Sequence, residues 1–188
     1  MYLRSVTLEG AHVRLEPLSL DHLRGLTAAA QEWGLTAERL REGIEAALRD
    51  QAAGTALPFA TIHAPTCQVA GSTRFRDAAP AHRRVEIGST WLGAAWRRTV
   101  VNTEAKLLML EHAFEVLGCA RVEFRADAIN TASRRALARI GATEEGTLRL
   151  YTVDAGGESR DVVVYSIIAP EWPTVRERIR ALLARSYP

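Results

Sequence analysis

The sequence predicts an α+β fold, in which a mixed, mostly antiparallel central sheet of about seven strands is flanked by helices. Three observations predict it: runs that alternate with strand spacing, apolar stripes with helical spacing, and the order of these segments along the 188 residues. That order is strand, two helices, three strands, helix, strand, helix, two strands and a terminal helix. The length suits one domain, so we expect a single domain over residues 1–188 with a helical appendage at 171–185.

Two helices follow a first short strand, and both have capping residues at their predicted starts. The strand covers residues 12–17, and the first helix covers 18–30 with Ser19 as a candidate N-cap. The second helix begins after Thr36 and stops at Gly54.

Three strand-like runs come next, separated by turns that contain proline. They cover residues 58–63, 68–76 and 83–92. Such spacing is typical of an antiparallel meander.

The second half of the chain alternates helices with strands. A helix is expected from Thr103 to about residue 117, and residues 121–127 alternate cleanly as a strand. Asn130 caps the next helix and Gly141 ends it. The remaining elements are strands at 143–153 and 160–168, a turn between them at 154–157, and the terminal helix.

Composition and charge exclude several classes of protein. The formal charge of +2 disfavours a nucleic-acid-binding module, and no apolar run is long enough to cross a membrane. Cys67 and Cys119 are expected to be free thiols in a reducing cytoplasm. The histidines are scattered, so we expect no metal. Lys106 is the single lysine among many arginines, which we attribute to genome composition.

The segment between the third run and the next helix predicts an anion site. A helix that starts at Thr103 directs unpaired N–H groups and a positive dipole end toward the preceding loop. Arg97 and Arg98 add charge to that loop, although such a pair taken alone is usually solvated.

This loop resembles the pyrophosphate-binding motif of the GNAT acetyltransferases, Gln/Arg-x-x-Gly-x-Gly/Ala before a helix. Val100 and Asn102 depart from it, because the family has Gly, and Gly or Ala, at these places. The branched side chain of Val100 is expected to lower the affinity for CoA. The resemblance implies acetyl-CoA as co-substrate, bound along this loop by Arg97, Arg98, Thr99, Val100, Val101, Asn102 and Thr103.

A second motif strengthens the resemblance. Asn130-Thr131-Ala132-Ser133 matches the family's Asn-x-x-Ser/Ala, with Gly141-Ala142 at the right distance. It is closest to the RimJ/RimL-like subgroup, which acetylates N-terminal amines of ribosomal proteins, and it covers roughly residues 7–168. The resemblance implies that Asn130 contacts the pantetheine and that Ser133 lies near the sulfur; a plain N-cap and a first-turn residue are the other interpretations. Many members have a Tyr where this chain has Leu137.

The strand at 83–92 is implied to part from its neighbour and to pair with the pantetheine. The N–H groups near Trp91 and Leu92 would then stabilise the oxyanion. Glu86, in the family-like Glu-Ile-Gly, is the candidate general base; a solvated strand glutamate is the alternative. His63, His82 and Asp77 are lesser candidates.

The acceptor is expected to be a primary amine of a peptide or small molecule. An α-amine, with a pKa of about 8, needs less help from a weak base than a lysine with a pKa of about 10.4. Its site is expected between the first two helices and the last hairpin, lined by Trp33, Arg74, Arg76 and Tyr151. Protein N-termini, amino acids, polyamines and aminoglycosides all stay open.

The departures at Val100, Asn102 and Leu137 leave one alternative function, a catalytically silent acyl-CoA-binding or regulatory protein on the same fold. The terminal helix and an exposed strand edge at 160–168 offer surfaces for a homodimer.

Overall fold

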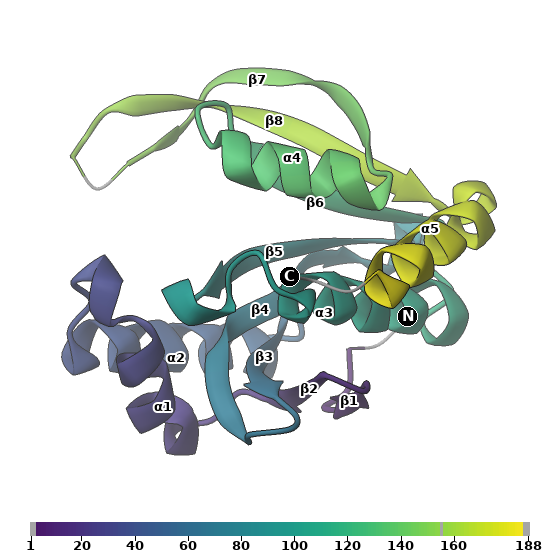
Figure 1. The fold of residues 1–188 in the computed structure, drawn as a ribbon. Helices are drawn as coiled ribbons and strands as arrows, with labels where there is room; N and C mark the ends of the chain where they lie inside the picture. The colour runs from purple at the N-terminus through teal and green to yellow at the C-terminus, as the bar shows by residue number, and fades with distance from the viewer. Residues whose placement is uncertain (1–2, 155, 186–188) are drawn as a thin grey trace.

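The computed structural model describes residues 3–154 and 156–185 and contains one eight-stranded sheet (Figure 1). The ends of the predicted domain and Ala155 of the predicted turn lie outside the described residues. Two elements precede the strand expected first: a two-residue strand, β1, and the turn that follows it.

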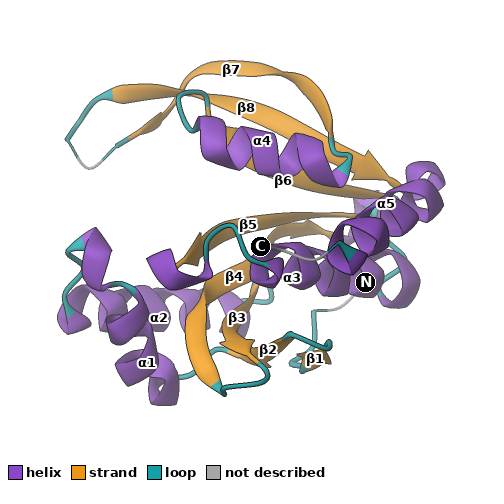
Figure 2. Cartoon of the chain, in the orientation of Figure 1, coloured by secondary structure: helices purple, strands orange, loops and turns teal. Residues whose placement is uncertain are grey.

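The strands are β1 (Leu8–Glu9), β2 (Val13–Pro17), β3 (Leu57–His63), β4 (Gln68–Ala79), β5 (Arg84–Leu92), β6 (Arg121–Asp127), β7 (Thr143–Val153) and β8 (Ser159–Ile168). The helices are α1 (Leu23–Ala29), α2 (Ala37–Ala52), α3 (Val100–Glu111), α4 (Thr131–Ile140) and α5 (Trp172–Ala184). Figure 2 distinguishes the helices from the strands by colour.

The sheet has the order β1-β2-β3-β4-β5-β6-β8-β7. Every neighbouring pair is antiparallel except β5 and β6, which are parallel. This confirms the predicted mixed, mostly antiparallel sheet. The helix α3 supplies the crossover that a parallel pair requires.

One prediction about the sheet is wrong: the strand at 160–168 is not an edge. β8 lies between β6 and β7, and β7 is the edge strand, with every residue exposed. The hairpin returns toward β6, because β8 carries the apolar residues that the core needs and β7 does not.

The predicted capping residues of the first two helices are confirmed. The Ser19 side chain accepts from the N–H of Asp21 at the start of a 3₁₀ turn, Leu20–His22, that leads into α1. The Thr36 side chain accepts from the N–H of Arg39 and starts α2. Each cap satisfies a helical N–H that would otherwise lack a partner.

The helix α3 begins three residues earlier than predicted. Its first residue is Val100 instead of Thr103, and its N-cap is Thr99, whose side chain accepts from the N–H of Val101. The prediction failed because Val100 and Val101 have low helix propensity, whereas the threonine cap and the burial of Val101 stabilise the helix. A π-helical turn, His112–Val116, follows the helix.

Two apolar clusters cover opposite faces of the sheet. The larger joins α3, α4 and α5 to the face that carries Phe59, Phe75 and Phe124. The smaller joins α1 and α2 to the face that carries Ala60 and Ile62. The sheet is therefore enclosed by α3 on one side and by α1 and α2 on the other, and β5 contributes to both clusters.

No helix in the described part of the chain combines the length and apolarity needed to cross a bilayer.

Candidate active site

The two parallel strands at the centre of the sheet pair only at their beginnings. Parallel pairing joins Arg84 to Arg121, Val85 to Val122 and Glu86 to Glu123, and within the described residues it goes no further. Beyond that point β5 stays with β4 and β6 stays with β8, so the two strands diverge (Figure 1). Their facing edges offer backbone N–H and C=O groups to an extended ligand that could lie between them.

A β-bulge in β5 changes which side chains face each side of the sheet. Gly88 pairs with Arg74 and Trp91 pairs with Ser72, so β5 has one residue more than β4 in this interval, and Ser89 has φ 48°. After the bulge, Leu92 packs in the α3 cluster and Trp91 packs against the α1–α2 cluster. Bulges of this kind redirect side chains beside functional sites.

Glu86 lies at the last paired position, on the face opposite α3. Its neighbours in sequence, Val85 and Ile87, belong to the α3 cluster, so the carboxylate faces the other way. The residue is only 3% exposed, which makes the interpretation as a solvated strand glutamate wrong. Gly88 provides the space for it, because a Cβ there would lie 2.6 Å from Glu86 Oε1.

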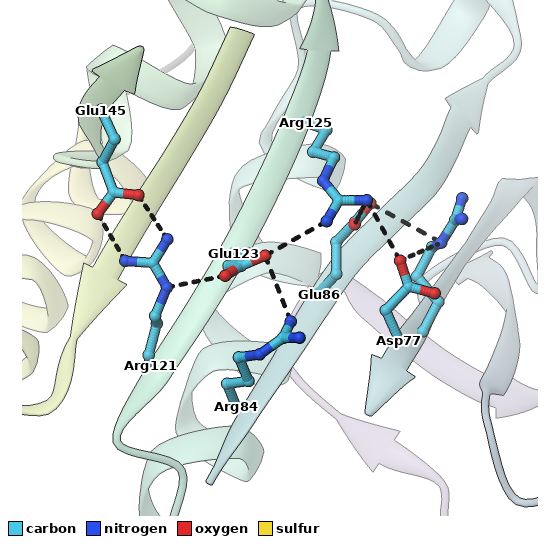
Figure 3. A network of polar contacts seen from close by, with 8 residues as sticks. Asp77, Arg84, Glu86, Arg121, Glu123, Arg125 and Glu145 are labelled. Atoms are coloured by element: carbon cyan, nitrogen blue, oxygen red, sulfur yellow. Dashed lines mark hydrogen bonds and ion pairs between the residues drawn. The ribbon is translucent and has the colours of Figure 1, made fainter. Parts of the chain in front are cut away.

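The carboxylate of Glu86 belongs to a charged network across β4, β5 and β6 (Figure 3). Arg125 Nη1 lies 3.2 Å from Glu86 Oε2, and Arg76 Nε lies 3.8 Å from Glu86 Oε1. Asp77 is shared by the same two arginines. The network continues through Glu123 and Arg121 of β6 to Arg84 of β5 and Glu145 of β7.

Burial raises the pKa of the Glu86 carboxyl above its usual range, and the arginines Arg125 and Arg76 oppose that rise. Asp77 adds a smaller upward contribution through its charge. A carboxylate with a raised pKa is a better proton acceptor than a solvated one, which suits a general base.

A cavity of about 270 Å³ lies on the same face as Glu86. It is bounded by apolar residues of α1 and α2 and by the bulge of β5, where Ser89 and Trp91 line it. Arg39 and Arg74 are its two cationic lining residues, and Arg74 Nη1 also lies 3.2 Å from Asp50 Oδ2. The cavity is therefore mostly apolar and extends to β5, the strand that diverges from β6.

The residues expected around the acceptor separate into three places. Arg74 lines the cavity, whereas Arg76 contacts Glu86. Tyr151 from the last hairpin lies under the guanidinium of Arg125, whose Cζ is 5.5 Å from the centroid of the tyrosine ring. Trp33 is not in the cavity; it is half exposed and stacks on Arg97 at 4.3 Å.

The loop before α3 carries two exposed arginines, of which Arg97 is fixed by contacts with other residues. Arg97 bonds to Glu32 at 2.9 Å and to the carbonyl of Leu92 at 3.3 Å. Arg98 is exposed and adopts the left-handed conformation, with φ 59°. Val100 is helical, so it does not need the positive φ that would strain a branched residue.

The first turn of α3 points its N–H groups into the same loop. Asn102 Oδ1 is buried and has no hydrogen-bond partner among the described residues. Thr103 is fully buried and accepts a bond of 2.9 Å from Arg139 of α4. Free strand edges, a helix start and an exposed arginine together fit a nucleotide thioester with an extended arm.

The start of α4 lies across the divergence from β5. Asn130 accepts from the N–H of Ser133 at 3.0 Å, which confirms its role as N-cap. Ser133 is partly exposed, and Leu137 is buried at 6% exposure. An apolar side chain therefore occupies the place where many GNAT enzymes have a tyrosine.

Two residues of the site were missed from the sequence. Arg125 was visible only as one charge on the polar face of a strand. Lys106 of α3 was attributed to composition, yet it is buried and its Nζ donates to Thr90 Oγ1 at 2.8 Å. The available signal was a lone lysine on the apolar side of a helix.

The described residues contain no group of three or more His, Cys, Asp or Glu side chains placed to hold a metal ion.

The fold and the site define a class: an acyltransferase-like sheet that opens beside a helix N-terminus. The family model of the acetyltransferase (GNAT) domain matches residues 12–143, and the chain belongs to this family. It is by family an acetyltransferase.

Similar proteins agree with this assignment. YoaA of Bacillus subtilis, an uncharacterized N-acetyltransferase, is 33% identical over 105 residues, which are 56% of this chain and 58% of that protein. The chain thus spans less than two thirds of that relative. The crystal structure of a GCN5-related N-acetyltransferase from Brucella melitensis has a TM-score of 0.90 and 31% identity, covering 98% of this chain and 88% of that one.

RimJ of Mycobacterium smegmatis, solved in complex with CoA-disulfide, has a TM-score of 0.77, with 90% of this chain and 88% of that chain covered. At 23% identity it shows the shared fold alone.

Proposed function

We propose that this chain transfers the acetyl group of acetyl-CoA to a primary amine, of a protein N-terminus or a small molecule, by direct attack in a ternary complex. One observation carries the proposal: the divergence of β5 and β6 begins at Glu86, a buried carboxylate that faces the cavity side of the sheet. A thioester between the strands and an amine in the cavity would meet at this point.

The residues that would hold acetyl-CoA surround the divergence on three sides. Pantetheine would pair with β5 near Trp91 and Leu92 and contact Asn130 and Ser133 across the gap. The pyrophosphate would take the first-turn N–H groups of α3 and the exposed Arg98. Because Thr103 is buried, its contribution would come through its place in this helix instead of its side chain. The remaining proposed residues of this loop are Arg97, Thr99, Val100, Val101 and Asn102.

The chain's own groups would act on both sides of the reacting carbonyl. Glu86 would accept the proton that the amine loses, and the β5 N–H groups at Trp91 and Leu92 would stabilise the oxyanion. Ser133 would lie near the sulfur as a hydroxyl donor. Neither step needs a group that the chain lacks.

An α-amine is the acceptor that these residues support best. Glu86, although its pKa is raised, is a weak base compared with an unperturbed lysine amine, whose pKa is about 10.4. An α-amine, with a pKa of about 8, is already deprotonated in roughly one molecule in ten at pH 7. The apolar walls of the cavity would accept the first side chain of such an acceptor.

We infer the cytoplasm as the compartment, because exposed Cys67 and buried Cys119 are not joined in a disulfide. For a homodimer we propose the exposed edge of β7, since an unpaired strand is a template for a second copy. Sedimentation of the wild-type chain would test it; a monomer at all concentrations would contradict it.

The test combines calorimetric titration with acetyl-CoA and an assay of thiol release. Three acceptors are compared: a short peptide with a free N-terminus, the same peptide N-acetylated but carrying one lysine, and free leucine. We expect binding of acetyl-CoA and turnover with at least one α-amine, with the blocked peptide inactive. Binding without turnover on any α-amine would favour the silent CoA-binding alternative, and no binding would contradict the proposal.

A further inference from the structure

The single lysine of the chain spans the divergence of β5 and β6 from the α3 side. Lys106 Nζ donates to Thr90 Oγ1 of β5 at 2.8 Å and lies 6.0 Å from the ring centroid of Phe124 on β6. The residue is 6% exposed. Its ammonium group therefore lies directly behind the place where the two strands diverge, on the face opposite Glu86.

Only one hydrogen bond separates this group from the open edge of β5. Thr90 is exposed, although its hydroxyl bonds to Lys106 on one side and to Thr73 Oγ1, at 2.7 Å, on the other. Thr73 in turn contacts Met109 Sδ of α3 at 3.6 Å. The polar chain begins at the surface and ends in the core, so a ligand between the strands would approach Lys106 through Thr90.

The departing sulfur needs an acid that can lose its proton near neutral pH, and α4 offers only the hydrogen bond of a serine hydroxyl. Leu137 is apolar and buried, so the helix lacks an acidic side chain there. Ser133 has a hydroxyl, but a serine hydroxyl does not lose its proton near neutral pH. An ammonium group can both stabilise a thiolate and donate a proton to it.

We propose that Lys106 is the catalytic acid of this acetyltransferase, donating a proton from its ammonium group to the CoA thiolate as the carbon–sulfur bond breaks. The inference rests on the proposed function. The amine nitrogen forms the new bond to the carbonyl carbon, and the sulfur leaves with the electron pair of the broken bond. Lys106 protonates it, Glu86 holds the proton from the amine, and both groups return to their starting states by exchange with water.

The environment of Lys106 suits this role. Burial lowers the pKa of its ammonium group to about 7, and no charged side chain of the described residues contributes to that shift. A free thiol has a pKa of about 8.5, so donation from Lys106 to a thiolate is favourable. If this position were purely structural, an apolar residue would make the fold more stable, because burying an ammonium group is unfavourable.

The test measures the thiol of bound CoA and needs no acceptor. The wild-type complex with CoA is titrated with base while thiolate absorbance is followed, and the acetyl-CoA complex, which has no free CoA thiol, supplies the background from Cys67 and Cys119. We expect the pKa of the bound thiol to lie below that of free CoA, because an opposite charge nearby favours the thiolate, but to stay above the pKa of Lys106, so that proton donation remains favourable. In Lys106→Met, which keeps the length without the charge, that lowering is lost.

Calorimetry on the same samples separates the two levels of the proposal. If CoA binds to both proteins and their thiols titrate alike, Lys106 is not the acid and the proposed function is unaffected. If CoA does not bind to the wild-type protein, the proposed function itself fails. Lys106→Gln provides a second variant in case Lys106→Met does not fold: it keeps a hydrogen-bond donor for Thr90 but removes the charge, so the lowering of the thiol pKa should be lost there as well.

Discussion

Glu86 and Lys106 are buried titratable groups on opposite faces of one sheet, beside the same divergence of strands. Glu86 is surrounded by charges: two arginines and Asp77 lie within the network on its face. Lys106 contacts the hydroxyl of Thr90 and lies near the ring of Phe124, and Thr90 is linked in turn to Thr73. Burial is the main cause of both shifts: it raises the pKa of the Glu86 carboxyl and lowers the pKa of the Lys106 ammonium group.

The difference shows how one sheet can hold a proton acceptor on one face and a proton donor on the other. On the charged face, arginines oppose the effect of burial, so the carboxylate keeps access to its ionised form as a base. On the apolar face nothing opposes it, and the ammonium group reaches a pKa of about 7, where it releases its proton readily. The bulge at Ser89 separates the two environments along β5.

Removing the base should have the largest effect. Glu86→Gln is expected to lower kcat/KM by about 10²–10⁴-fold, because the amine proton then has no acceptor. In the wild type, turnover should fall as pH decreases through the raised pKa of Glu86, and the variant should lack that fall and keep only the one caused by protonation of the amine acceptor. Thiol release across a pH series measures both.

A matched control for this variant is Glu123→Gln, which removes a carboxylate of the same network from the neighbouring strand. It should stay within a few-fold of wild type. Equal losses in both variants would mean that the network matters as a whole and that Glu86 is not the base.

Removing the ammonium group of Lys106 should lower turnover less than removing Glu86 does, and it should also make stability less dependent on pH. Lys106→Met is expected to lower kcat by about 10–100-fold, at the low end of acid–base contributions. The pKa of Lys106 falls from about 10.4 in the unfolded chain to about 7 in the fold, so the wild type loses stability as pH falls between these values. The variant lacks this loss.

Urea unfolding at two pH values measures the second effect. The stability advantage of Lys106→Met should be larger at pH 7 than at pH 10.5. An equal advantage at both pH values would show that Lys106 has the same pKa in the folded and the unfolded chain. That result would contradict the lowering of its pKa by burial.

Filling the space next to the carboxylate should have an intermediate effect. In Gly88→Ala the new Cβ would lie 2.6 Å from Glu86 Oε1 and 3.0 Å from Arg76 Cδ, so the carboxylate must move. We expect kcat to fall about tenfold, a loss typical of a misplaced catalytic group. Calorimetry should give an unchanged affinity for acetyl-CoA; a weakened affinity would place the damage in the strand instead.

The smallest effect is expected on α4. Ser133→Ala should change kcat by less than about threefold if Lys106 is the acid, because a positioned acid contributes far more. A loss as large as that of Lys106→Met would transfer the role to Ser133. Thermal unfolding is the control, since the capping bond uses the backbone of Ser133 and stays intact.

The sequence predicts the order of elements and several site residues for identifiable reasons. Asn130 and the cap residues were found because a helix start marks them locally, whereas Glu86 was selected because Glu86-Ile87-Gly88 resembles the Glu-Ile-Gly of the family. The start of α3 was misplaced because two valines conceal a helix that tertiary burial stabilises.

Other features could not be predicted because they depend on contacts between distant segments. The position of Lys106 results from the packing of α3 against both diverging strands, and no local pattern records it. The order of β8 and β7 was missed for another reason: the apolar residues of β8 favour an inner position, but only the sheet order shows that β8 pairs with β6 on one side and β7 on the other.

The crystal structure of the chain with CoA tests the account most directly. We predict that the pantetheine lies between β5 and β6, with the sulfur on the α3 side within hydrogen-bond reach of Lys106 Nζ and with Glu86 on the opposite face. A pantetheine that lies in the cavity beside α1 and α2, or a sulfur distant from Lys106, would contradict it.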